Sequence, residues 1–374
     1  MKRVGFSAVS ALLLLTISQS ALAEWGLNMT EGVTRVSHEV HDLHMTIFYI
    51  CVAIAVVVFG VMLYSIIYHR KSRGAKAENF HESTVVEIIW TIIPLVILVG
   101  MCIPATATLI DMYDNTDSEI DIQVTGYQWK WRYTYLNEGV DFFSNLSTPS
   151  EQLELDNTQE KNINYLLEVD KPLVLPVDTK VRFLFTSKDV IHSWWVPDLA
   201  VKKDTIPGFI NESWAIIDKP GIYRGQCTEL CGKGHGYMPI VVKAVSKQEY
   251  KTWVTAQAVA QAAAKEIKDM SFDELMTQGE KVYNTNCAAC HKKNGTGIPP
   301  MFPALKDSPI AMGDISDHIK IVLKGKQGTA MSAFAEQLSV SDIASVVTYE
   351  RNAWGNNKGD HATPMSVKKI KDNK

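Results

Sequence analysis

A short glycine-rich loop, CTELCGKGHGYMP at residues 227–239, carries several side chains that bind soft metal ions. Nitrogen and sulfur ligands of this kind favour copper over magnesium or calcium. A second imidazole is needed to complete such a site, and His192 in the segment DVIHSWW is the best candidate. The glycines of the loop allow a backbone tight enough for the side chains to converge. The pattern predicts a copper centre whose side-chain ligands are His192, Cys227, Cys231, His235 and Met238.

Two other interpretations compete with a copper pair at this loop. A disulfide between Cys227 and Cys231 is chemically possible in an exported protein, but it leaves His192, His235 and Met238 without a role. A mononuclear blue copper site uses one cysteine, whereas this loop offers two. The ligand count therefore favours a site that uses both thiols.

A second motif, Cys287-Ala-Ala-Cys290-His291, has the form of a c-type haem attachment site. Its two thiols can add to the haem vinyl groups, and His291 follows directly to place an imidazole under the iron. A zinc knuckle or a thioredoxin-like site would use a similar pair of cysteines. Export of the chain and a helical segment before the motif favour haem, for which a second axial ligand must come from downstream.

The N-terminal third of the chain predicts export and membrane insertion. Residues 1–23 combine Lys2 and Arg3 with an apolar stretch and a small-residue end, as in a secretory signal peptide. Uncharged runs at about 45–68 and 88–110 are long enough to cross a bilayer as helices. The short loop between them is rich in Lys and Arg, which places it on the cytoplasmic side. Both ends of this hairpin, within the segment 24–117, then face the periplasm.

Two sets of ionisable residues flank the apolar runs. Glu87 stands directly before the second run, at a position where an acid can be functional or simply solvated. The histidines His38, His41 and His44 share a helix face before the first run. A polar interfacial helix explains these histidines better than a metal site does.

The remaining chain divides into two further domains. Residues 118–245 alternate apolar and polar residues in short runs with proline and glycine between them, which predicts a Greek-key β domain. Within it, the polar segment 138–162 reads as a surface insertion. Residues 246–270 form a linker rich in Ala, Gln and Lys, and 271–355 predict an α-helical domain. The last segment, 356–374, is expected to be a polar, disordered tail. The net charge of −4 gives no indication of a nucleic-acid partner.

The copper loop and its upstream His-Ser-Trp segment resemble the binuclear copper centre, CuA, of cytochrome c oxidase subunit II. The resemblance implies a cupredoxin-like fold, bridging sulfurs from Cys227 and Cys231, and terminal imidazoles from His192 and His235. It implies three further ligand roles around the pair. Met238 would be a weak axial ligand. The backbone carbonyl of Glu229 would bind copper, and its carboxylate would bind a magnesium ion shared with subunit I.

The resemblance extends over nearly the whole mature chain. The segment after the linker is similar to class I cytochrome c, in which a methionine placed like Met331, in GTAMSAF, is the second axial ligand of the haem. A thioether ligand raises the haem potential, which suits a donor to copper. Trp129 in GYQWKWRYTY matches the tryptophan where electrons enter the copper domain of the family. Glu87 matches a glutamate at the cytoplasmic entrance of a proton path.

The chain thus resembles subunit II of a bacterial caa-type oxidase, with electrons passing from haem c to copper and then to haem a of subunit I. The resemblance implies that the partners are subunit I with haem a, haem a3 and copper B, subunit III, membrane lipid, and an electron donor that is either a cytochrome c or a membrane complex. It also implies a location in the bacterial inner membrane, with the redox domains in the periplasm. Oxygen reduction and proton translocation would take place with subunit I. A quinol oxidase subunit lacks the copper ligands. A nitrogen-oxide reductase subunit with CuA and a structural assembly subunit remain alternatives.

Overall fold

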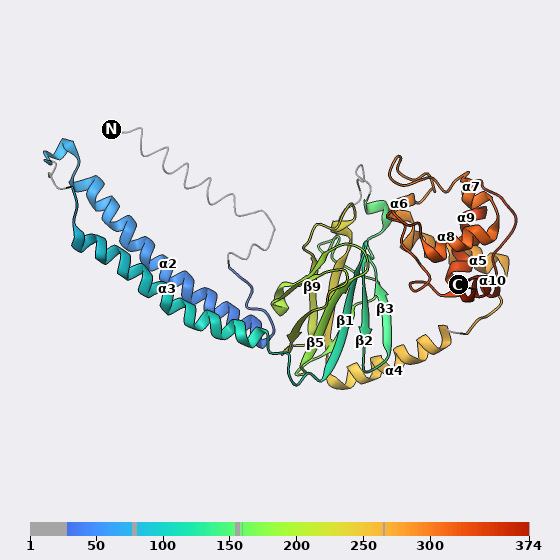
Figure 1. The fold of residues 1–374 in the computed structure, drawn as a ribbon, viewed down its shortest axis with the longest axis horizontal. Helices are drawn as coiled ribbons and strands as arrows, with labels where there is room; N and C mark the ends of the chain where they lie inside the picture. The colour runs from blue at the N-terminus through green and yellow to red at the C-terminus, as the bar shows by residue number, and fades with distance from the viewer. Residues whose placement is uncertain (1–27, 77–80, 154–157, 159, 265, 374) are drawn as a thin grey trace. The chain divides into compact units, whose positions relative to one another are not determined.

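The computed structural model describes residues 28–373 except 77–80, 154–157, 159 and 265 (Figure 1). The predicted signal peptide, residues 1–23, lies outside the described residues and stays a prediction. The described chain contains an α-helical hairpin, a β-sandwich and a helical domain, as the sequence predicted.

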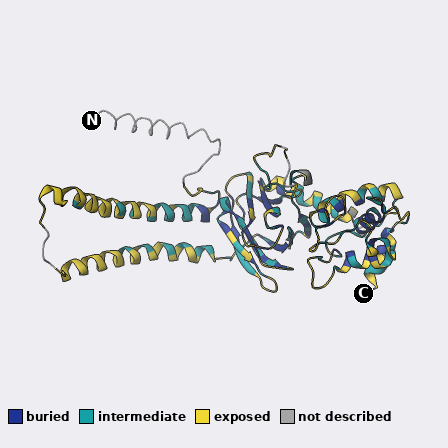
Figure 2. Cartoon of the chain, turned by 90° about the horizontal axis from the view of Figure 1, so that it is seen from above, coloured by how far each residue is buried: buried dark blue, intermediate teal, exposed yellow. Residues whose placement is uncertain are grey.

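The hairpin consists of two long apolar helices, α2 (Arg35–Tyr68) and α3 (Thr84–Met112). Both are long and apolar enough to cross a membrane, and their side chains are largely exposed (Figure 2). Helix α2 begins ten residues before the apolar run, because Thr34 and Ser37 form a capping box at its N-terminus. His38, His41 and His44 therefore lie in the first turns of the same helix. The two prolines within α3, Pro94 and Pro104, are tolerated in a helix of this kind.

Two five-stranded sheets form the next domain, in the orders β3-β2-β1-β5-β8 and β4-β10-β9-β6-β7. Their inward residues alternate with outward ones along each strand, most regularly in β5, and form a single buried cluster. The strands are β1 (Ile120–Tyr127), β2 (Lys130–Tyr135), β3 (Val140–Ser144), β4 (Leu173–Pro176), β5 (Val181–Ser187), β6 (His192–Val196), β7 (Val201–Thr205), β8 (Asn211–Ala215), β9 (Gly221–Cys227) and β10 (Pro239–Val245).

The prediction of a polar insertion over 138–162 is wrong at its start. Residues Val140–Ser144 form β3, which pairs with β2, and Val140 and Phe142 are buried in the sandwich core. Only two apolar side chains face inward in a strand this short, so the polar residues around it hid the alternation.

The linker begins with helix α4 (Lys247–Ala264). Its first turns carry Tyr250 and Trp253, which pack against Tyr135 of the sandwich core. This contact stabilises the start of a helix that its Ala-rich composition already favours, since most helical stability in proteins comes from tertiary packing.

Six helices form the C-terminal domain around one buried cluster. Helices α5 and α9 cross closely at Gly279, where an added Cβ would lie 2.2 Å from the Ser345 carbonyl oxygen. The helices are α5 (Phe272–Asn286), α6 (Ala288–His291), α7 (Pro309–Met312), α8 (Ile315–Lys324), α9 (Val340–Asn352) and α10 (Pro364–Asp372).

The expectation that the tail 356–374 is disordered is also wrong. Helix α10 begins at a capping box formed by Thr363 and Ser366, and Val367 is fully buried in the helical domain. The Lys371 ammonium donates a hydrogen bond to the Ala335 carbonyl at 2.5 Å. The apolar positions of this segment are few but lie on one face, so a short amphipathic helix can dock there despite its polar composition.

Candidate metal centre and haem-attachment segment

Neighbouring strands bring the ends of the copper-loop region together. Strand β6 begins at His192, strand β9 ends at Cys227, and the two strands pair through Trp194 and Cys227. The pairing continues one residue further, where the Thr228 amide donates to the Ser193 carbonyl at 3.0 Å. From there the chain loops through the 3₁₀ turn His235–Tyr237 and returns as β10. Ligand positions far apart in sequence therefore meet at one end of the second sheet.

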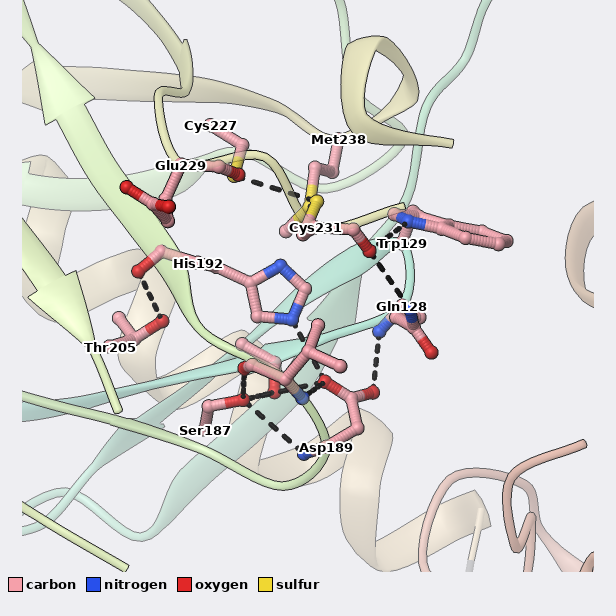
Figure 3. A network of polar contacts seen from close by, with 12 residues as sticks. Gln128, Trp129, Ser187, Asp189, His192, Thr205, Cys227, Glu229, Cys231 and Met238 are labelled. Carbon is pink, nitrogen blue, oxygen red and sulfur yellow. Dashed lines mark hydrogen bonds and ion pairs between the residues drawn. The ribbon is translucent and has the colours of Figure 1, made fainter. Parts of the chain in front are cut away.

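The sulfur and nitrogen atoms of this loop lie close together (Figure 3). One ligand atom each from His192, Cys227 and Cys231 lies within 4.8 Å of the others, and all three residues are buried. The two Sγ atoms are 3.8 Å apart, and both cysteines are free thiols. Cys231 Sγ also lies 3.5 Å from His235 Nδ1 and 3.6 Å from Met238 Sδ. The structure thus brings together every side chain that the sequence placed around the copper pair.

The His192 imidazole is oriented by a carboxylate that the sequence analysis missed. Its Nε2 lies 2.9 Å from Asp189 Oδ1, while its Nδ1 is buried and has no hydrogen-bond partner among the described residues. Burial lowers the pKa of His192, but the hydrogen bond with the Asp189 carboxylate and the negative charge of a Cys227 thiolate nearby outweigh it and raise the pKa overall. A buried nitrogen without a partner is costly, and metal ligation would satisfy it.

Close packing holds this imidazole from the other side as well. A Cβ on Gly126 would lie 2.7 Å from the His192 ring, so glycine is required where β1 passes the site. Trp131 packs against the same ring edge-on, with centroids 6.0 Å apart, and its Nε1 donates to the Met238 carbonyl. The ring is consequently fixed before any metal binds.

The pKa values of the two thiols differ because each cysteine acts on the other in the opposite direction. The hydrogen bond from Cys231 lowers the pKa of Cys227 to about 3, against the opposing effect of burial. The thiolate of Cys227 in turn raises the pKa of Cys231. Of the two sulfurs, Cys227 is therefore the more readily deprotonated, and the thiolate is the form that binds metal.

A carbonyl of the loop connects the site to the aromatic strand. Trp129 Nε1 and Gln128 Nε2 both donate to the Cys231 carbonyl, at 3.1 and 2.8 Å. The Gln128 backbone amide also donates to Asp189 Oδ2 at 2.7 Å. A Cβ on Gly234 would lie 2.3 Å from the Trp129 indole. Trp129 is therefore bonded and packed directly against the metal loop.

The two predicted carboxylates occupy different surroundings. Glu229 has its backbone carbonyl 3.4 Å from Cys227 Sγ, while the residue itself is exposed at the rim of the loop. Glu87 lies in the first turn of α3, exposed, with its carbonyl accepting a hydrogen bond from Thr91 Oγ1.

In the helical domain, the attachment segment is held by the start of the following loop. His291 Nδ1 lies 2.8 Å from the Pro303 carbonyl oxygen, which leaves Nε2 as the ring nitrogen available to iron. Cys287 and Met331 both pack against the domain core. Met301, by contrast, is 63% exposed. Packing thus favours Met331 over Met301 as a ligand for a group bound in this core.

Asp189 and Gln128 are the residues that sequence reasoning missed. Asp189 stands three residues before His192 in D-V-I-H, and Gln128 directly precedes Trp129. Carboxylates commonly orient metal-bound imidazoles, so an acid beside the predicted ligand was the available indication for Asp189.

Comparisons with known proteins agree with this organisation. The family described as "Cytochrome C oxidase subunit II, periplasmic domain" matches residues 120–245, and its transmembrane domain matches residues 22–107. Residues 274–349 match the family "Cytochrome C oxidase, cbb3-type, subunit III".

Individual proteins similar to the chain come from bacteria and plants. A probable cytochrome c oxidase subunit 2 from Rickettsia bellii is 36% identical over 62% of this chain and 84% of the relative. Cytochrome c oxidase subunit 2 from Arabidopsis thaliana is 37% identical over 67% of this chain and 96% of the relative. Among solved structures, the periplasmic domain of subunit II from Bradyrhizobium japonicum is 36% identical, with a TM-score of 0.34, over 38% of this chain and 96% of that one.

Proposed function

Because this chain belongs to the cytochrome c oxidase subunit II family and carries a cytochrome c domain, we propose that it receives electrons at a covalent haem c and passes them through a CuA centre to haem a of subunit I. It is a component of an oxidoreductase complex, and its two apolar helices anchor a periplasmic-type domain. Oxygen reduction and the proton movement linked to it belong to the complex as a whole.

The observation that carries this proposal is the convergence of nitrogen and sulfur atoms at the metal loop. Cys227, Cys231, His192 and His235 supply the two sulfurs and two imidazoles that a copper pair needs, and Met238 supplies a thioether. The orphaned Nδ1 of His192 fits a metal ligand and no other described partner. When bound, the copper pair supplies a one-electron relay whose charge is shared between two ions.

The helical domain fits a covalent haem. Cys287 and Cys290 would carry the thioether bonds, and His291 is held through Nδ1 with Nε2 available to the iron. Met331 is the second axial ligand that we propose, because it packs on the same core cluster as Cys287. The haem supplies a one-electron couple, which the protein tunes through its ligands and surroundings.

Three further residues have proposed roles that rest on their positions. Trp129 would admit electrons to the copper loop, since its indole N–H binds the carbonyl of Cys231 directly. The exposed Glu229 carboxylate would hold a magnesium ion shared with subunit I. Glu87, exposed in the first turn of α3, would stand at a proton path into subunit I.

The partners and location follow from the same assignment. We infer contacts with subunit I, with subunit III, with membrane lipid around α2 and α3, and with a cytochrome c or membrane complex as donor. The proposed location is the bacterial inner membrane, with the copper and haem domains in the periplasm.

Glu87→Gln is expected to slow oxidase turnover severalfold while haem c still reduces copper at the normal rate. Slowed copper reduction would refute the role of Glu87.

Metal and haem analysis of the purified full chain tests the proposal as a whole. We expect a copper pair in a mixed-valence state and one covalent haem per chain, seen by metal assay, electron paramagnetic resonance and a pyridine haemochrome spectrum. A correctly folded chain with Cys227 and Cys231 joined in a disulfide, or one without copper, would overturn it. Turnover with nitric or nitrous oxide instead of oxygen would favour a nitrogen-oxide reductase.

A further inference from the structure

A buried pair of ionisable side chains lies in the haem domain, outside the residues given a ligand role above. His318 on α8 and Glu350 on α9 face each other, with Nε2 2.8 Å from Oε2. Their side chains are 2% and 5% exposed. Acidic residues are almost never buried to this degree without a partner, so the imidazole is the group that permits Glu350 to lie here.

The nearest buried cation is committed to other groups. Arg351 follows Glu350 in the chain, but its guanidinium donates to the Asp360 carboxylate at 2.6 and 2.5 Å and to the Ala311 and Gly313 carbonyls. The charge on Glu350 is therefore balanced chiefly by whatever charge His318 carries.

The other elements packed against α8 and α9 add little charge near the pair. Helix α7 has no titratable side chain, and Tyr283 of α5 donates its hydroxyl hydrogen to the Lys292 carbonyl at 2.6 Å. Lys371 of α10 donates to the Ala335 carbonyl, and Lys368 pairs with Asp372. On α5, the charged residues Asp273, Glu274, Glu280 and Lys281 are all exposed. The remaining titratable and charged groups on these helices and the loop between α9 and α10 are Tyr283, Cys287, Asp317, Lys320, Lys324, Asp342, Tyr349, Arg351, Lys358, Asp360, His361, Lys368, Lys369, Lys371 and Asp372.

The pair lies on helices that pack with the haem-attachment segment, because Cys287 packs against the same buried cluster that contains Ile319 of α8 and Val347 of α9. Burial raises the pKa of the Cys287 thiol, and the Glu350 carboxylate raises it further. The same two causes, in the same order, raise the pKa of Tyr283. Because Cys287 is bonded to the porphyrin in the proposed function, a charge that acts on its sulfur also acts on the haem.

The pair can hold one of two charges. A carboxylate facing Nε2 requires that nitrogen to donate, so a neutral imidazole leaves the pair at −1 and the Nδ1 lone pair without a partner among the described residues. Protonation at Nδ1 makes the imidazolium and brings the pair to zero. Adding an electron to the haem favours the protonated pair, because the protonated pair places less negative charge near the added electron.

We propose that the His318–Glu350 pair sets the reduction potential of haem c and takes up a proton when the haem is reduced. The electron comes from the one-electron donor of the haem and goes to the iron. The proton comes from periplasmic water and goes to His318 Nδ1, and no other bond changes. The proposal rests on the proposed function only in placing a haem at Cys287 and Cys290.

Spectroelectrochemical titration of haem c in the full, haem-loaded chain between pH 5.5 and 8.5 tests the proposal. The wild-type potential should fall as pH rises, by at most about 59 mV per pH unit, which is a tenfold change in a one-electron equilibrium. Glu350→Gln should raise the potential and remove most of the pH dependence. His318→Asn should remove the pH dependence and leave the potential near the wild-type value at high pH. The matched control is Asp317→Asn, an exposed acid on α8 paired with Lys320, which should change neither quantity.

Each result decides the matter. A wild-type potential that is constant with pH overturns the proposal without any variant, so poor folding of His318→Asn cannot hide the answer. A Glu350→Gln protein that keeps the wild-type slope and potential also overturns it, and assigns the pH dependence to other groups such as the haem propionates. Absence of covalent haem would instead refute the proposed function.

Discussion

The copper loop and the haem segment carry similar ligands but are built in opposite ways. At the copper loop, the backbone of two paired strands and one tight loop holds thiol, imidazole and thioether within contact of one another. In the haem segment, the His291 imidazole is held by one hydrogen bond to the Pro303 carbonyl, and Cys287 packs against the apolar cluster of the domain. The candidate copper ligands contact one another as well as the residues that support them, whereas the residues of the haem segment contact mainly the core of their domain.

This difference predicts different responses to change. A site with fixed ligands should lose its metal when one ligand is removed, while the surrounding fold persists. A site that depends on packing and covalent attachment should keep its cofactor when an axial ligand is removed, but with altered electronic properties. The variants below test this contrast, from the largest expected effect to the smallest.

Cys227→Ser should abolish the binuclear copper signal completely. The variant removes one of the two sulfurs that lie 3.8 Å apart, and a hydroxyl does not replace a thiolate bridge for copper. Electron paramagnetic resonance and copper assay measure the loss, and the haem spectrum should be unchanged. Cys102→Ser, in the exposed surface of α3, is the matched control and should keep full copper content. Loss of haem together with copper would break the contrast between the two regions.

Met331→Ala should keep the haem attached but lower its potential by on the order of 0.1 V or more, since axial ligands set haem potentials over a range of about 0.8 V. The proposed covalent bonds to Cys287 and Cys290 do not depend on the Met331 side chain. Redox titration and the spin state of the ferric haem give the measurement. Met301→Ala is the control, because Met301 is 63% exposed. An effect of Met301→Ala as large as that of Met331→Ala would assign the ligand wrongly.

Asp189→Asn should weaken copper binding by about 10- to 100-fold without removing the centre, the range typical of partners that orient a metal-bound imidazole. The variant loses the carboxylate that lies 2.9 Å from His192 Nε2 and also accepts the Gln128 amide. Competition with a copper chelator measures the affinity. Asp204→Asn, an acid on β7 whose backbone carbonyl rather than carboxylate accepts from Asn211, serves as control. Unchanged affinity in Asp189→Asn would mean that packing by Gly126 and Trp131 alone holds the ring.

The candidate ligands of both regions could be predicted from the sequence, but the residues that support them could not. Ligand types and spacings are local, so Cys227, Cys231, His235 and Met238 could be read directly, and His192 followed from the need for another imidazole. Asp189 and Gln128 act through contacts that exist only after β1, β6 and the metal loop meet. The strand at Val140–Ser144 and helix α10 were missed for a related reason. Each has few apolar residues, and its stability comes from docking on a surface that the sequence does not display.

The last prediction concerns how an arginine–carboxylate pair of the haem domain responds as the pH falls; the sandwich contains a similar pair. In the haem domain, the hydrogen bond from Arg351 lowers the pKa of Asp360, and in the sandwich the hydrogen bond from Arg182 lowers the pKa of Asp121. A carboxyl with a lowered folded-state pKa binds fewer protons folded than unfolded, so its stabilisation is complete above the unfolded pKa of about 3.8 and is lost as pH falls below it.

Asp360→Asn should therefore destabilise the haem domain at neutral pH by about 2 kcal/mol, a figure typical of hydrogen bonds to charged groups. Solvent around the Asp360 side chain, which is 40% exposed, screens its interaction with Arg351. The difference from wild type should shrink as pH falls below about 3.8, where the unfolded carboxyl begins to bind a proton, and should vanish once the pH is below the lowered pKa of folded Asp360. Denaturant unfolding of the full chain, followed at the haem Soret band, measures the haem domain separately from the copper absorbance of the sandwich. Asp372→Asn, an exposed acid paired with Lys368 on α10, is the control. A difference between Asp360→Asn and wild type that persisted undiminished at low pH would show that Arg351 relies on the carbonyls of Ala311 and Gly313 and not on the charge of Asp360.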